Sequence, residues 1–269
     1  MSTLVLQDAP RGHYHVKNVV KSEVLKILTL RSNAIVLAVT VMAGLLVTGL
    51  VANANLHHGS GYYFGFDPTQ NSLTGLIVAG LTGGVFGALL ITGEYASGTI
   101  RASIAATPRR PMLLATKIGV AAAVTVVFCE LLSFASFFLG QAVLSGGGAP
   151  SAGLSSPGAL RAVTMTGAFI ALMALMSFGF GLILRSTAGA IAAFVGVIFV
   201  LPLAMHGISE HALRYVPTTI LTNSIMSTVN QGNGGVLSPL SPTVGLLLMA
   251  LYAAIALAVG AVLFVRRDA

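Results

Sequence analysis

Six long apolar stretches constrain the fold of this chain more than any other feature of its sequence. A helix needs about 20 residues to cross the roughly 30 Å of hydrocarbon in a bilayer, at about 1.5 Å of rise per residue. Each stretch meets this length, and together they occupy about half of the 269 residues. We therefore expect an all-α membrane protein with six transmembrane helices, at approximately 34–52, 73–93, 118–140, 162–184, 188–208 and 244–265.

The composition excludes a soluble or disordered chain. Hydrophobic residues make up 55% and charged residues only 8%, with a mean hydropathy of +0.91. Seven acidic residues are too few for a soluble surface of this size. The single cysteine, Cys129, excludes an intrachain disulfide and argues against a cysteine metal site. The net charge of +7 does not indicate a nucleic-acid partner, because the basic residues cluster between the apolar stretches.

The basic residues predict the orientation of the chain. Twelve of the 14 lie before the first stretch, between the second and third, between the fourth and fifth, or after the sixth. The other side has only Arg161 and Arg214. By the positive-inside rule, both termini are cytoplasmic in a multi-pass protein of the cell (plasma) membrane. We expect residues 1–15 to form a flexible cytoplasmic N-terminus, and residues 16–269 to form one transmembrane domain.

Residues 16–31 read as an amphipathic helix that lies in the inner membrane interface. At 100° per residue, Val16, Val20, Val24 and Ile27 share one face, whereas polar residues that include Lys26 lie opposite. The lysines would then lie near anionic headgroups, which makes membrane lipid an expected partner. A plain solvated basic segment is the alternative.

The loop at 93–117 contains the most informative pattern in the sequence. Glu94 stands at the membrane edge, and a Ser-Gly-Thr turn follows it. Thr99 is expected to cap a short helix through Ala106, which Pro108 ends. Arg109 and Arg110 would hold the loop at headgroup level. A short, rigid helix at the membrane suits docking better than catalysis, although composition alone is equally compatible with an ordinary inner loop.

The order of the residues in this loop resembles that in the ABC-2 family of ABC transporter permeases. The resemblance rests on Glu94, Ser97, Gly98, Thr99, Ile100 and Arg101, then Thr107-Pro108-Arg109-Arg110 and Lys117, and on the six-span topology. It implies a type V exporter-like fold, with a cytoplasmic coupling helix and short outer helices between spans five and six. By position, the residues that couple to an ATPase subunit would be Glu94, Ser97, Gly98, Thr99 and Arg101.

The resemblance also implies partners. The chain has no Gly-x-x-x-x-Gly-Lys-Ser/Thr motif, so ATP and Mg²⁺ would be held by a separate ATP-binding cassette ATPase subunit. A second copy of the permease is expected, and the substrate would be hydrophobic or amphipathic. The alternative is a non-transporting immunity or sensor subunit with the same fold. We predict no catalytic residue, no metal site and no cofactor in this chain, which lacks the His-Glu-x-x-His and Gly-x-Ser-x-Gly motifs.

Four residues are candidates for a substrate path through the membrane, namely Phe86, Glu130, Phe194 and Phe199. Glu130 is the only acidic residue well inside a stretch, and no stretch contains an interior Lys or Arg. A charge at mid-span costs about 2.5–3.5 kcal/mol, so Glu130 is either a functional contact or a neutral carboxyl bonded to Ser133 or a threonine. Glycines at small-xxx-small spacing, including Gly83 and Gly87, predict close helix packing.

Overall fold

The computed structural model describes residues 16–56, 66–106, 110–208, 210–227 and 240–267, and every regular element within these ranges is helical. Six of its helical segments are long and apolar enough to cross a membrane, which confirms the predicted fold class. The expected N-terminal tail at 1–15 and the expected stop at Pro108 lie outside the described residues.

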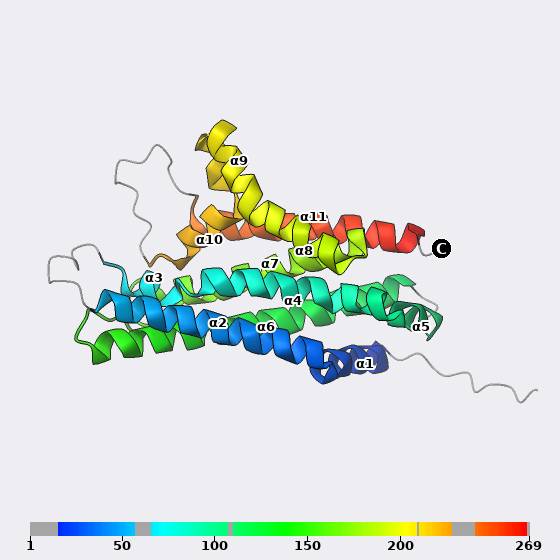
Figure 1. Ribbon diagram of the computed structural model, residues 1–269, viewed down its shortest axis with the longest axis horizontal. Helices are drawn as coiled ribbons and strands as arrows, with labels where there is room; N and C mark the ends of the chain where they lie inside the picture. Colours follow the sequence, from blue (N-terminus) through cyan, green and yellow to red (C-terminus); the bar gives the residue numbers. More distant parts are fainter. Residues whose placement is uncertain (1–15, 57–65, 107–109, 209, 228–239, 268–269) are drawn as a thin grey trace, which may run out of the picture.

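The spans run roughly along one axis, except for the fifth, which is inclined to the others (Figure 1). Each overlaps one predicted stretch. The spans are α2 (Arg31–Asn55), α3 (Pro68–Leu73) followed by α4 (Leu76–Ser97), α6 (Arg110–Gly146), α7 (Ala159–Leu184), α8 (Thr187–Val195) extended into α9 (Leu201–Ile208), and α11 (Pro242–Arg267).

Helix α7 forms the centre of the bundle, where it packs against α4, α6, α8 and α11. Its side chains supply much of the buried core, including Phe169, Phe178 and Leu182. Gly87 allows α4 to approach α7 closely, because a Cβ at this position would overlap the backbone carbonyl of Ala174. The predicted close packing of α4 is therefore present at Gly87.

Helix α6 begins at Arg110, before the predicted start of the third span at residue 118. Lys117 consequently lies inside this helix with a buried side chain. The apolar stretch at 118–140 contains no basic residue, but the helix that includes it begins earlier and takes in Lys117. The apolar stretch underestimates the length of the helix. A helix can continue beyond its apolar segment wherever tertiary contacts satisfy the polar side chains.

The fifth span is not the single regular helix that the sequence predicts. A π-helical turn at Gly196–Val200 separates α8 from α9. Pro202 lies just beyond this turn and has no N–H to donate to the carbonyl four residues earlier, which favours a shift of the hydrogen-bond spacing here. Helix α9 then leaves the bundle axis at an angle (Figure 1).

Short helices follow the fifth span, as predicted: a 3₁₀ helix, η3 (Glu210–Tyr215), and α10 (Pro217–Ile225). Three buried residues of α10, Ile220, Leu221 and Ile225, belong to the main core. The segment after α10 is fixed by Asp67, whose Oδ2 accepts the N–H of Ser227 at 2.7 Å, and by Arg161, which donates to two carbonyls there.

The opposite end of the bundle contains α1 (Val16–Thr29), α5 (Thr99–Ala106) and the C-terminal end of α11 (Figure 1). Both described ends of the chain thus lie on the same side of the spans. We call this side the α5 end of the bundle.

Candidate functional site

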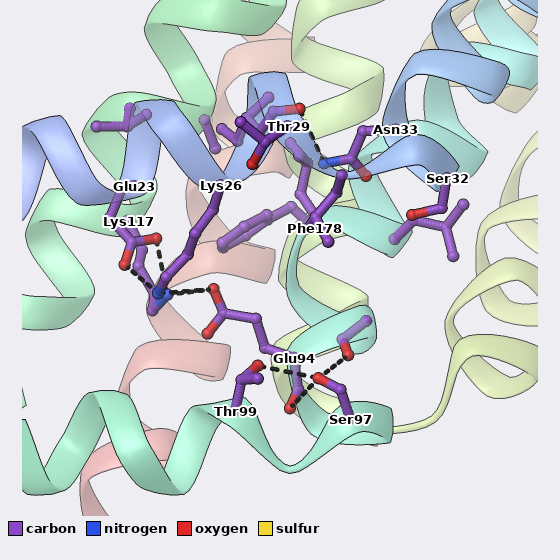
Figure 2. A pocket seen from close by; sticks show the side chains of 17 residues that line it. Glu23, Lys26, Thr29, Ser32, Asn33, Glu94, Ser97, Thr99, Lys117 and Phe178 are labelled. Carbon is purple, nitrogen blue, oxygen red and sulfur yellow. Dashed lines mark hydrogen bonds and ion pairs between the residues drawn. The ribbon is translucent and has the colours of Figure 1, made fainter.

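Four charged residues from three helices meet at the α5 end. Glu23 and Lys26 lie on α1, Glu94 lies one turn before the end of α4, and Lys117 lies two turns into α6. Helix α1 reaches this position because it packs against α6 and connects to α2 through the single extended residue Leu30. We call these four residues the ion cluster (Figure 2).

Lys117 is the centre of the ion cluster. Its Nζ donates to Oε2 of Glu23 at 2.8 Å and to Oε1 of Glu94. Lys26 Nζ lies 2.8 Å from Oε1 of Glu23 and 3.6 Å from Oε1 of Glu94. It also donates to Oγ of Ser103 on α5 at 3.1 Å. The ion cluster therefore joins α1, α4 and α6 directly, and it reaches α5 through Ser103.

The four side chains differ in exposure, and this difference decides how much each ion pair contributes to the stability of the fold. The side chain of Lys117 is 3% exposed, those of Glu23 and Glu94 are 8% and 10% exposed, and that of Lys26 is 35% exposed. A buried charge is tolerated only when it is paired and hydrogen-bonded. Two carboxylates and two ammonium groups give a formal charge of zero, so the ion cluster balances its own charge.

Lys26 has a raised pKa, above the ordinary value of 10.5. Burial by itself lowers the pKa of this ammonium, but the hydrogen bond to Glu23 and the charges of Glu94 and Glu23 outweigh it. Lys26 is therefore protonated throughout the physiological range, and its pairing with α4 persists there.

The turn from α4 into α5 is built on Gly98. Its φ of +71° lies in the left-handed region, which glycine adopts without strain. The prediction that Thr99 caps α5 is wrong, because Gly98 occupies the position before the helix and Thr99 is already its first residue. The Thr99 hydroxyl instead lies 2.9 Å from the hydroxyl of Ser97, and this contact spans the turn.

A concave surface lies beside this turn. It has a cavity volume of about 730 Å³, and it is lined by residues of α4 and α5 that include Tyr95, Gly98 and Arg101, together with Arg185 at the end of α7. The guanidinium carbon of Arg185 lies 5.6 Å from the centre of the Tyr95 ring. Exposed Arg101 and half-buried Arg185 make this surface positively charged.

The structure thus places the five predicted coupling residues at one turn, although it does not test their role. Glu94 belongs to the ion cluster, Ser97 and Thr99 pair across the turn, and Gly98 forms it. Arg101 lines the positively charged surface.

Sequence reasoning did not place Glu23 in the site, and although it named Lys117 in the loop pattern, it did not predict that Lys117 is buried and paired with Glu23. The sequence contained a signal for Glu23, because at 100° per residue it falls about 20° from Val16, at the edge of the predicted apolar face. The face of α1 that packs on the protein is therefore partly ionic. Lys26 was assigned to the lipid headgroups, but it pairs with Glu23 and Glu94 instead.

The four candidate path residues do not meet on one surface. Phe86 is buried and its ring centre lies 6.5 Å from that of Phe128, while Phe194 is buried against Gly84. Phe199 is 54% exposed on the π-helical turn. The Glu130 carboxyl lies against Gly167 of α7. Their role in a substrate path stays a prediction.

Comparison with known proteins identifies the family. A protein-family model described as ABC-2 family transporter protein matches residues 66–269. The chain belongs to this family. The ABC-2 protein is therefore a multi-pass membrane component of an ABC transporter, and such components are not themselves catalytic. The match includes Glu94 and Lys117 but not α1. No curated protein matches the chain.

Proposed function

We propose that this ABC-2 protein is the permease subunit of an exporter that moves a hydrophobic or amphipathic substrate across the cell membrane. The energy comes from ATP and Mg²⁺ bound to a separate ATPase subunit, and two copies of the permease form the membrane part. In this arrangement the α5 end, both termini included, faces the cytoplasm, in keeping with the distribution of basic residues.

The observation that carries the proposal is the attachment of α5 to α1, α4 and α6. Gly98 fixes the turn from α4, and the ion cluster fixes α4 to α1 and α6. Lys26 connects the same cluster to α5 through Ser103. A push on α5 would therefore move the ends of these helices together, because a packed and hydrogen-bonded junction transmits displacement better than a solvated loop.

The positively charged surface beside α5 gives the ATPase a place to dock. Arg101 on α5 and Arg185 after α7 offer planar, multiply hydrogen-bonding cations, while Tyr95 offers an aromatic ring. We propose that an acidic side chain of the ATPase subunit enters this surface. Motion of the ATPase would then reach α5 and α7 at once.

The test is co-expression with an ABC ATPase subunit of the same organism, purification of the complex, and assay in lipid nanodiscs and proteoliposomes. Arg101→Glu should abolish co-purification, because it reverses the charge of the docking surface. The matched control is Arg266→Glu, at an exposed position of α11, which should leave the complex intact. If the two variants co-purify equal amounts of the ATPase subunit, docking at α5 is refuted.

Transport is tested separately with a fluorescent amphiphile loaded into the proteoliposomes. The proposal expects ATP-dependent movement of the dye that fails without the permease. A complex that hydrolyses ATP in response to the amphiphile but never moves it would instead favour the sensor or immunity alternative.

A further inference from the structure

A cavity lies directly beside the ion cluster, whose four residues all line it. Its volume is about 430 Å³, and it is lined from α1, α2, α4, α5, α6 and α7. The cavity exists because Leu30 is extended and lets α2 turn away from α1 (φ −72°, ψ 117°). Cavities of this size hold small organic molecules.

The lining of the cavity has two chemically different parts. The ion cluster and the hydroxyls of Ser97 and Thr99 form one part. The other part is apolar and includes Leu89, Leu90 and Phe178. Figure 2 shows the ion cluster at one side of the cavity and polar Ser32 and Asn33 at the other, with Phe178 between them. Such a lining matches a molecule with one polar end and an apolar body.

The charges of the cavity select against an ionic ligand. Glu23 and Glu94 already balance Lys26 and Lys117. An added ammonium would lie against two lysines and an added anion against two glutamates, with no unmatched countercharge to stabilise either. The hydrogen bonds, in contrast, are not all satisfied. Oε2 of Glu94 is buried and has no hydrogen-bond partner within the described part of the chain. A buried acceptor of this kind favours a donor that carries no charge.

We propose that this cavity binds an uncharged amphipathic molecule, with a hydroxyl group that donates to Glu94 and an alkyl part packed on Leu89, Leu90 and Phe178. The hydroxyl can belong to a neutral lipid of the adjacent leaflet or to a free amphiphile. The inference does not depend on the proposed transport function, because binding is measured on the permease alone.

The absence of tryptophan from the sequence gives a direct binding assay. Leu30 lines the cavity and is 50% exposed, so Leu30→Trp places a single fluorophore there. The reference reporter is Leu247→Trp, at a 70% exposed position on α11. The probe is ω-bromododecanol in nanodiscs, because bromine quenches tryptophan on contact. We expect saturable quenching at residue 30 and only linear, unsaturated quenching at residue 247. Linear quenching at both positions would overturn the proposal.

Filling the cavity should remove the saturable quenching. Gly93 lines the cavity, and a Cβ added there meets no atom within 4 Å, so Gly93→Leu fills space without a backbone clash. Gly119→Leu is the matched control, since Gly119 is equally open but does not line the cavity. Saturable quenching that survives Gly93→Leu would place the probe elsewhere and refute the site.

The selectivity for charge provides the sharpest test. We expect no saturable quenching by ω-bromododecylammonium or ω-bromododecyl sulfate in the reporter protein. Glu94→Gln leaves the ion cluster with one excess positive charge, so the sulfate should gain binding and the alcohol should lose it. Saturable binding of all three probes, or no change of preference in Glu94→Gln, would refute recognition by the ion cluster.

Competition separates the two sources of the hydroxyl. Displacement of bound ω-bromododecanol by diacylglycerol in the nanodisc identifies a lipid ligand. Displacement by a short alkyl glucoside added from water identifies a free amphiphile. Displacement by neither would overturn the assignment to uncharged hydroxyl amphiphiles.

Discussion

Removal of the ammonium group of Lys117 should destabilise the protein far more than removal of that of Lys26. Lys117→Met leaves Glu23 and Glu94, whose side chains are at most 10% exposed, with only the partly exposed Lys26 as a countercharge. Breaking a buried ion pair on one side costs about 3–5 kcal/mol, because the remaining charge stays buried without its partner. Lys26 is about one-third exposed, so Lys26→Met should cost less than about 1 kcal/mol.

The assay is reversible unfolding by SDS in mixed micelles, with helix content as the signal. The triple variant Lys117→Met, Glu23→Gln, Glu94→Gln is the control, because it removes the charge from both partners. It should recover most of the lost stability, since an uncharged replacement of a buried ion pair is often neutral. Equal effects of the two lysine substitutions, or a triple variant as unstable as Lys117→Met, would refute the argument that burial decides the energy.

Three further predictions concern the backbone and the orientation. Gly98→Val should cost about 1–2 kcal/mol, because it forces a β-branched residue to a φ of +71°, and it should lower ATPase-coupled transport while the spans remain inserted. Gly87→Ala should destabilise the bundle by about 1–3 kcal/mol in the same SDS assay, because its methyl group meets the carbonyl of Ala174. In a Cys129→Ala background, a cysteine at exposed Ser145 should react with an impermeant maleimide on intact cells, and one at exposed Ala102 only after permeabilisation.

The sequence predicted the spans well because hydropathy is a local property that adds along the chain. It could not predict the ion cluster, because the cluster depends on contacts between residues far apart in sequence. Lys117 lies 94 positions from Glu23 and 23 from Glu94. A lysine next to a span normally reads as a headgroup contact, and only the packing of α1 on α6 shows that it is buried. The break in the fifth span shows the same limit. The sequence contains Pro202, but it did not predict the π-helical turn that precedes this proline.

Glu130 provides the last test, because its surroundings differ from the predicted ones. Ser133, its expected partner, donates to the carbonyl of Val163 at 2.7 Å instead. The Glu130 carboxyl lies against α7, where a Cβ on Gly167 would meet its Oε2 at 2.7 Å. This oxygen is buried, with no hydrogen-bond partner in the described part of the chain. A neutral carboxyl fits this position, because an ionised one would be buried in mid-span without a countercharge.

Two substitutions then separate a packing role from a functional one. Glu130→Gln keeps the size of the side chain and should leave stability and transport unchanged. Gly167→Ala should destabilise the contact between α6 and α7, because Glu130 must move away from the new methyl group. Both are measured by SDS unfolding and by dye transport in proteoliposomes. Lost transport in a stable Glu130→Gln protein would show that the ionisable group itself is required, and Glu130 would then be a substrate or proton contact and not a packing residue.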